Sequence, residues 1–284
     1  MGLPECSVAS LEAGESLAGT AVESVDRWLL LEVTDPWAPK ALQTEALPEP
    51  VRACLAEWLK TPRSRLQLIR RPGRSGKRPM FMLASSAAGR QTVSKLELDR
   101  YEDLLDVDLE ALPTKTGAPM CLVCVHGRRD RCCALYGAAL FRAVQTHGID
   151  VWQTSHLGGH RFAACALWLP EGLMYGRLRS EHAAAFVAAR QAGEIGTLDL
   201  FRGRCAYDRP TQAAEILLRS RLGNQTADAI EWLTTVAEPE SIWEVRFRSA
   251  SGGQVVRVQL EDTGVTRPAS CGGDPEPVTR FVEL

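Results

Sequence analysis

The first third of the chain consists of short apolar runs and one segment with helical spacing. Residues 27–33 (RWLLLEV) predict a buried strand, and residues 65–69 and 80–84 predict two more. Between the first two, residues 49–59 (EPVRACLAEWL) repeat their apolar positions with the period of a helix. We therefore expect residues 1–112 to form a mixed α/β unit.

The middle of the chain has a regular alternation of apolar runs and amphipathic segments. Residues 120–125 (MCLVCV) form a continuous apolar run, typical of a buried strand. The predicted elements are strands at 120–125, 151–155, 162–169 and 173–178, and helices at 134–147 and 181–192. This β–α–β–β–α order is that of a thioredoxin-like domain, in which helices pack on the faces of a central sheet. We assign it to residues 113–222, after a change of pattern around residues 112–118.

The last part of the chain predicts a C-terminal extension over residues 223–284. Helices are expected at residues 211–222 and 226–236. Two strands at 242–249 and 254–261 are separated by Ser-Gly-Gly, which predicts a β-hairpin. The fold class is thus α/β (α+β), with a thioredoxin-like domain between two smaller units.

The composition excludes some classes of protein. The formal net charge of −2 does not favour binding to nucleic acid through release of counterions. Apolar runs are too short to cross a membrane, and the N-terminus lacks the basic and apolar regions of a secretion signal. We expect a cytoplasmic protein without a membrane partner.

The basic stretch at residues 70–77 (RRPGRSGK) contains Pro and Gly, and this composition predicts a surface turn. Its spacing is not that of a phosphate-binding P-loop. The functional alternative is a docking site for an acidic redox partner.

The cysteines indicate a metal or redox site. There are nine, an odd number, without a secretion signal, so a disulfide framework is a poor interpretation. Cysteines 121, 124, 132 and 133 lie within thirteen residues of one another. The segment from Cys124 to Cys133 leaves the predicted strand and enters the next predicted helix. A second group, His156-Leu-Gly-Gly-His160, follows the next strand.

The two histidines could share one face of a helix, but two glycines lie between them. Glycine costs about 1 kcal/mol in a helix interior, so a tight loop is the better prediction for Gly158 and Gly159. Such a loop would let the backbone approach a bulky inorganic group.

The residues alone leave zinc, an iron–sulfur cluster and no metal open, because thiolates and imidazoles bind both kinds of centre. Cys121-Leu-Val-Cys124 has the spacing of a zinc knuckle or of a redox-active thiol pair. In a strand, however, these two side chains would point to opposite faces. This geometry counts against both uses of the pair. A zinc-stabilised interaction module and a thioredoxin-like thiol oxidoreductase are the alternative functions.

Two motifs resemble the signatures of a known family. The segments CVHGRRDRCC and SHLGGHRFA are similar to the patterns C-x-H-G-x-x-D-x-x-C and S-H-x-G-G-[HD]-R-F-A of the sucrase/ferredoxin-like family. Trp152 takes the place of the Trp in the strand before the second pattern. The resemblance covers about residues 118–222 and implies a thioredoxin-like ferredoxin domain.

In family members with C-x8-C and H-x3-H, these four residues bind a [2Fe–2S] cluster. The resemblance carries this role to Cys124, Cys133, His156 and His160. Many bacterial relatives have Asp at the position of His160, so its presence favours the bis-histidine form. The implied function is electron transfer or redox sensing, with proton-coupled one-electron chemistry and a redox partner protein. We expect a carrier rather than a catalyst, and no acid pair supports a glycosidase.

Neighbouring residues have simpler interpretations. Cys132 could replace Cys133 as a ligand through a register shift of one residue. His126 is expected to support the ligands by hydrogen bonding. We expect Cys121, Cys165 and Cys205 to be small core residues.

Overall fold

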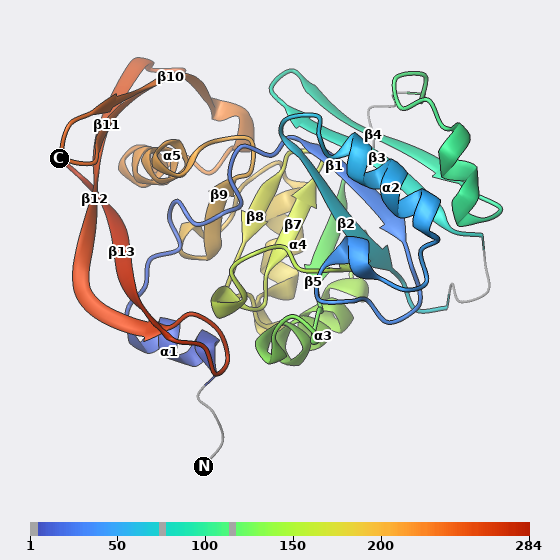
Figure 1. Cartoon of the computed structure of the whole chain (residues 1–284). Coiled ribbons are helices and arrows are strands. Elements are labelled where there is room, and N and C mark those ends of the chain that lie inside the picture. Colours follow the sequence, from blue (N-terminus) through green and yellow to red (C-terminus); the bar gives the residue numbers. More distant parts are fainter. Residues whose placement is uncertain (1–4, 74–77, 114–117) are drawn as a thin grey trace.

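The computed structural model describes residues 5–73, 78–113 and 118–284 (Figure 1). The predicted turn at residues 70–77 and the predicted boundary at residues 112–118 fall partly outside these described residues. Within the described residues, nine strands form one mixed sheet, in the order β4-β3-β1-β2-β6-β5-β7-β8-β9. Their bounds are β1 Arg27–Glu32, β2 Ser64–Arg70, β3 Met80–Ala87, β4 Arg90–Glu97, β5 Met120–Cys124, β6 Asp150–Thr154, β7 Ala166–Leu169, β8 Leu173–Tyr175 and β9 Phe201–Arg204.

The central four strands have the predicted topology. β5 pairs in parallel with β6 on one side and antiparallel with β7 on the other, and β8 follows β7 as a hairpin partner. Helix α3 (Arg131–Gln145) connects β5 to β6, and α4 (Ala183–Gln191) follows β8. The molecule is therefore of the mixed α/β class, and the β–α–β–β–α unit is present.

The sheet continues into the N-terminal unit. β2 pairs antiparallel with β6 through Ile69 and Arg70, and β1 pairs with both β2 and β3. Helix α2 (Glu49–Trp58) covers these strands and buries Val51 and Leu55. Because one sheet spans residues on both sides of residue 112, the division into domains stays a prediction.

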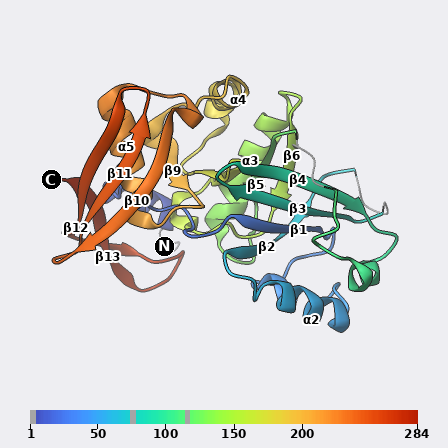
Figure 2. The ribbon, with the colours of Figure 1, turned by 90° about the horizontal axis from the view of Figure 1, so that it is seen from above.

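The C-terminal part is a separate antiparallel sheet, with strand order β10-β11-β12-β13. The bounds are β10 Ile230–Glu238, β11 Ile242–Ser249, β12 Gly252–Pro268 and β13 Pro275–Glu283. Helix α5 (Arg209–Leu222) lies against its inner face, where Leu218, Phe247 and Val258 are buried together (Figure 2). The short N-terminal helix α1 (Cys6–Glu12) lies near the far end of β12 and β13 (Figure 1).

One predicted element is wrong. Residues 226–236 were expected to be helical, but Ile230–Glu238 form strand β10, paired antiparallel with β11. Thr234, Thr235 and Val236 are β-branched and favour the extended backbone, so ladder hydrogen bonds prevail over the helical spacing. The predicted helix at 211–222 and both predicted strands of the hairpin are confirmed as α5, β11 and β12.

Among the described residues, no helix has both the length and the apolar character needed to cross a membrane.

Candidate metal centre

The predicted ligands come from the ends of two adjacent parallel strands. Cys124 is the last residue of β5, and His156 follows the end of β6 by two residues. The carboxyl ends of parallel strands lie at the same edge of a sheet, so the two side chains meet there. Cys133 is in the first turn of α3, the helix that follows β5.

Three of the four predicted residues bring donor atoms together. The thiols of Cys124 and Cys133 and a ring nitrogen of His156 lie within 4.8 Å of one another. The Cys133 Sγ atom is 3.9 Å from His156 Nδ1. His160 adjoins the group, with its ring centre 5.4 Å from that of His156.

The His160 ring is held by one nitrogen and has the other unsatisfied. Its Nε2 atom is 2.7 Å from the carbonyl oxygen of Ala269, in the loop between β12 and β13. Its Nδ1 atom is buried and has no hydrogen-bond partner among the described residues. Burial lowers the pKa of His160, which keeps the ring neutral. A neutral imidazole with one nitrogen anchored is the form that binds metals.

The loop that carries the histidines is the predicted tight turn. Gly158 and Gly159 have φ values of 100° and 69°, which L-residues rarely adopt. A Cβ atom on Gly159 would lie 2.5 Å from Arg202 Nη2. The buried Arg202 side chain donates to the carbonyl oxygens of Gly158 and Thr20. These hydrogen bonds hold the turn in place.

Helix α3 approaches the end of β5 very closely. A Cβ atom on Gly137 would lie 1.9 Å from the carbonyl oxygen of Cys124. The helix begins after Asp130, whose Oδ1 accepts a hydrogen bond of 2.8 Å from the N–H of Cys132. This N-cap satisfies a backbone donor that the first turn leaves without a partner.

The pKa values of the Cys124 and Cys133 thiols are shifted in opposite directions. Hydrogen bonding from the Cys133 thiol, followed by the interaction with His156, lowers the pKa of Cys124 well below its ordinary value. The same contact, together with burial, raises the pKa of Cys133. The contact between the two thiols thus shifts their pKa values in opposite directions.

The alternative thiol pair does not converge. Cys121 packs with Val123, Leu140 and Phe141, whereas Cys124 belongs to the core on the other face of the sheet. The expectation that these side chains point to opposite faces is confirmed. Cys121, Cys165 and Cys205 are all buried in the core, as expected.

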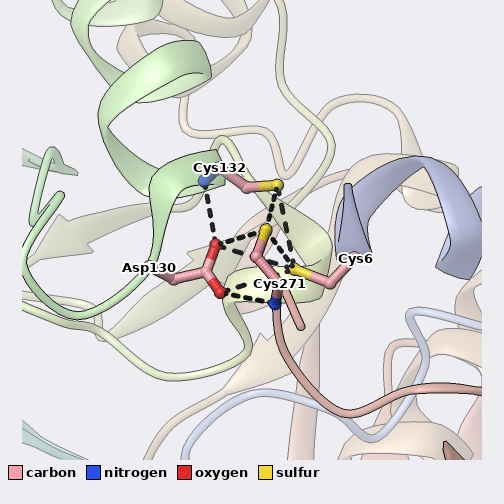
Figure 3. Close-up of side chains that lie close together, drawn as sticks. All are labelled: Cys6, Asp130, Cys132 and Cys271. Atoms are coloured by element: carbon pink, nitrogen blue, oxygen red, sulfur yellow. Dashed lines mark hydrogen bonds between the residues drawn. The ribbon is translucent and has the colours of Figure 1, made fainter. Parts of the chain in front are cut away.

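Two neighbours are placed outside the group of three donors. The ring of His126 packs edge-on against Trp37, with 5.8 Å between ring centres. Its supporting role stays a prediction. The side chain of Cys132 lies with Asp130 and two distant cysteines, Cys6 and Cys271 (Figure 3). Sequence analysis did not single out these two, since nothing in their local sequence indicates that they meet.

The chain matches the model of one protein family, described as sucrase/ferredoxin-like, over residues 17–203. Among solved structures, it is similar to two cysteine-to-serine variants of the thioredoxin-like [2Fe–2S] ferredoxin from Aquifex aeolicus. Each is 18% identical, has a TM-score of 0.27, and covers 30% of this chain and 99% of its own. A further structure of that ferredoxin is 17% identical, with a TM-score of 0.26, over 30% of this chain and 89% of its own. No curated protein matches the chain significantly.

Proposed function

The chain belongs to the sucrase/ferredoxin-like family, and from that premise we propose that it is an iron–sulfur protein for electron transfer or redox sensing. Its ligands are Cys124, Cys133, His156 and His160, and the centre is a [2Fe–2S] cluster. The family match and the meeting of Cys124, Cys133 and His156 at one edge of the sheet carry this proposal.

The donor set fits such a centre. Thiolates and neutral imidazoles are the ligands of histidine-containing [2Fe–2S] clusters, in which imidazole replaces thiolate on one iron. The lowered pKa of Cys124 favours the thiolate, which is the form of cysteine that binds metals. The buried Nδ1 atom of His160, which has no partner among the described residues, is the kind of atom that a metal would satisfy.

When bound, the cluster would supply one-electron transfer. The protein's contribution is to orient the ligands and to manage protons. The carbonyl oxygen of Ala269 holds the Nε2 side of His160. His156 is half-buried and lines a hollow of about 700 Å³, together with His126 and Arg129. We therefore assign proton exchange with solvent to His156 rather than to His160.

A thiol oxidoreductase is disfavoured by the position of its thiols. The redox-active pair of that class must approach each other, but Cys121 and Cys124 pack into cores on opposite faces of the sheet. A zinc-stabilised module at the same four residues is the remaining alternative, and the test below distinguishes it.

The test is anaerobic purification of the full chain, followed by metal analysis, visible absorption and EPR of the reduced protein. We expect about two irons per chain, a coloured oxidised form and an EPR signal after one-electron reduction. A colourless protein that contains only zinc, and whose zinc is lost in Cys133→Ser, would exclude the cluster. Cys54→Ser is the matched control, because this thiol lies on α2, outside the site.

A further inference from the structure

A second group of donor atoms lies beside the first. Cys6 is the first residue of α1, Cys132 is in the first turn of α3, and Cys271 is in the loop between β12 and β13. Their thiols and the carboxylate of Asp130 all lie within 4.8 Å of one another (Figure 3). Cys6 and Cys271 are 265 residues apart in the chain.

The distances are those between ligands of a single tetrahedral metal ion. The Cys132 and Cys271 sulfurs are 3.4 Å apart, and each is 3.7 Å from the sulfur of Cys6. With zinc–sulfur bonds of about 2.3 Å, the edge of a tetrahedron between two sulfurs is about 3.8 Å.

The Asp130 carboxylate lies at the fourth corner of the same tetrahedron. Asp130 Oδ1 is 3.3 Å from the sulfur of Cys271 and 3.6 Å from that of Cys6. A zinc–oxygen bond of about 2.0 Å gives a sulfur–oxygen edge of about 3.5 Å. Five of the six donor separations thus match those of a tetrahedron, and the sixth, between Asp130 and the Cys132 sulfur, is within 4.8 Å.

The surroundings hold these donors in place. Cys6 and Cys132 are fully buried, and Asp130 is 5% exposed. The Ser7 hydroxyl donates to the Cys132 sulfur over 3.3 Å, and the N–H of Cys271 donates to Asp130 Oδ2 over 3.1 Å. Hydrogen bonds of this kind orient the ligands of a metal site from outside.

The donor chemistry selects the metal. Three thiolates favour a soft or borderline ion, and the carboxylate oxygen is a poor ligand for Cu(I) but an ordinary one for zinc. Iron–sulfur clusters are held mainly by thiolates, so a carboxylate among the four donors also favours zinc over a cluster. All four positions are filled by protein donors, which is typical of structural rather than catalytic zinc.

We propose that Cys6, Cys132, Cys271 and Asp130 form a structural zinc site, separate from the candidate cluster. Zinc at this position joins the N-terminal helix, α3 and the β12–β13 loop. The same loop supplies the Ala269 carbonyl oxygen that anchors His160. The site therefore fixes one support of a predicted cluster ligand, although its existence does not depend on the cluster.

The test uses the full chain, purified anaerobically with a thiol reductant. Zinc and iron are measured separately by mass spectrometry, and the zinc environment by X-ray absorption at the zinc edge. We expect about one zinc per chain, with three sulfurs at about 2.3 Å and one oxygen at about 2.0 Å.

Variants locate the metal. Cys271 is the most exposed of the three thiols, so Cys271→Ser is the least disruptive of folding. We expect it to lower the zinc content at least tenfold after dialysis against a chelator that the parent protein withstands. Cys6→Ser should do the same, while Cys54→Ser keeps its zinc. Retention of the iron content in Cys271→Ser would show that the variant is folded.

Three results would overturn the site. One is zinc below about a tenth of an equivalent, both as purified and after incubation with Zn²⁺ and desalting. Another is a Cys132–Cys271 disulfide in anaerobically alkylated protein. The third is zinc that survives Cys271→Ser but is lost in Cys133→Ser, which would also refute the proposed cluster. Absence of iron with zinc lost in Cys271→Ser would refute the cluster alone.

Discussion

Cys132 and Cys133 are adjacent residues that face different sets of donors. They lie in the first turn of α3, where consecutive side chains are about 100° apart around the helix axis. Cys133 therefore reaches Cys124 and His156, while Cys132 reaches Cys6 and Cys271. The sequence motif alone left the register open by one residue, because both are cysteines.

This arrangement predicts opposite outcomes for two neighbouring substitutions. Cys133→Ser should lose most of the visible absorption and iron, because serine is a far weaker ligand for iron than thiolate. Cys132→Ser should keep both. Absorption spectra and iron analysis of the two variants provide the measurement, with Cys205→Ser as a buried control. Loss of iron in Cys132→Ser alone would place the ligand one residue earlier.

Replacing either histidine by cysteine should change the midpoint potential of the proposed cluster. In His156→Cys and in His160→Cys, an anionic thiolate would replace an imidazole of the proposed cluster and would stabilise its oxidised form. Both variants should retain a cluster and have a lower midpoint potential, measured by redox titration. Each 59 mV corresponds to about a tenfold change in the one-electron equilibrium. Unchanged potentials in both variants would remove the histidines from the ligand set.

Imidazole ligands also predict proton coupling. If these imidazoles bind the proposed cluster, its reduction would raise the pKa of a ligand N–H, so that a proton would be taken up with the electron. Between the oxidised and reduced pKa values, the midpoint potential should fall by about 59 mV per pH unit. Voltammetry across neutral and alkaline pH measures this slope.

The two histidines should contribute unequally to that slope. Ala269 accepts from the Nε2 side of His160, so loss of this proton would break a hydrogen bond. His156 lines the open hollow. We therefore expect His156→Cys to flatten the pH profile more than His160→Cys does. A flat profile in the parent protein, once iron is shown to be bound, would contradict proton coupling altogether.

At the scale of elements, sequence patterns predicted the strands and helices that position the candidate centre. The continuous apolar run that became β5 and the glycine pair before His160 are local signals with direct structural causes. Strand β10 was missed because its side chains are mostly exposed. Its sequence therefore lacks the alternation of apolar and polar residues that indicates a half-buried strand. The separate β12–β13 loop reaches His160 only through the tertiary fold, which no local pattern encodes.

The contact between β5 and α3 predicts a reversal of the usual effect of alanine in a helix. Gly→Ala in a helix interior ordinarily stabilises by about 1 kcal/mol. At Gly137 the new methyl group would overlap the carbonyl oxygen of Cys124. We expect Gly137→Ala to lower the free energy of unfolding by about 1–3 kcal/mol, as overpacking does. Urea unfolding measures this loss.

The matched control for that substitution is Gly253→Ala. Its Cβ would meet no atom within 4 Å, and the residue lies in strand β12. We expect its free energy of unfolding to be unchanged or slightly higher. Equal effects at the two glycines would mean that α3 can move away from Cys124 without cost.

At the scale of the whole molecule, segments from the N-terminal and C-terminal parts of the chain meet beside the candidate centre. Glu15 is 4% exposed and pairs with Arg267 of β12 at 3.0 Å and with Arg161, next to His160, at 2.8 Å. These residues come from the N-terminal, C-terminal and central parts of the chain. Sequence analysis could not predict such pairs, nor the meeting of Cys6 with Cys271, because each partner is an ordinary residue in its local context.

The buried Glu15 carboxylate predicts a pH-dependent contribution to stability. Burial alone would raise the pKa of Glu15, but the hydrogen bond from Arg267 and the charge of Arg161 lower it below its ordinary value. A carboxyl group with a lowered folded-state pKa stabilises the fold above the unfolded-state pKa, about 4.3 for Glu. This contribution is lost as the pH falls through the folded-state value.

Glu15→Gln should therefore lower the free energy of unfolding by about 3 kcal/mol at pH 7, because the buried Arg267 loses its buried partner charge and keeps only the more exposed Glu276. The difference from the parent should shrink as the pH falls below about 4. Urea unfolding from pH 7 to pH 3 measures it, in the Cys133→Ser background so that acid loss of a cluster does not contribute. Glu231→Gln removes an exposed ion pair with Arg248 and should change stability by less than about 1 kcal/mol. A pH-independent difference for Glu15→Gln would mean that its charge does not hold these N-terminal and C-terminal segments together.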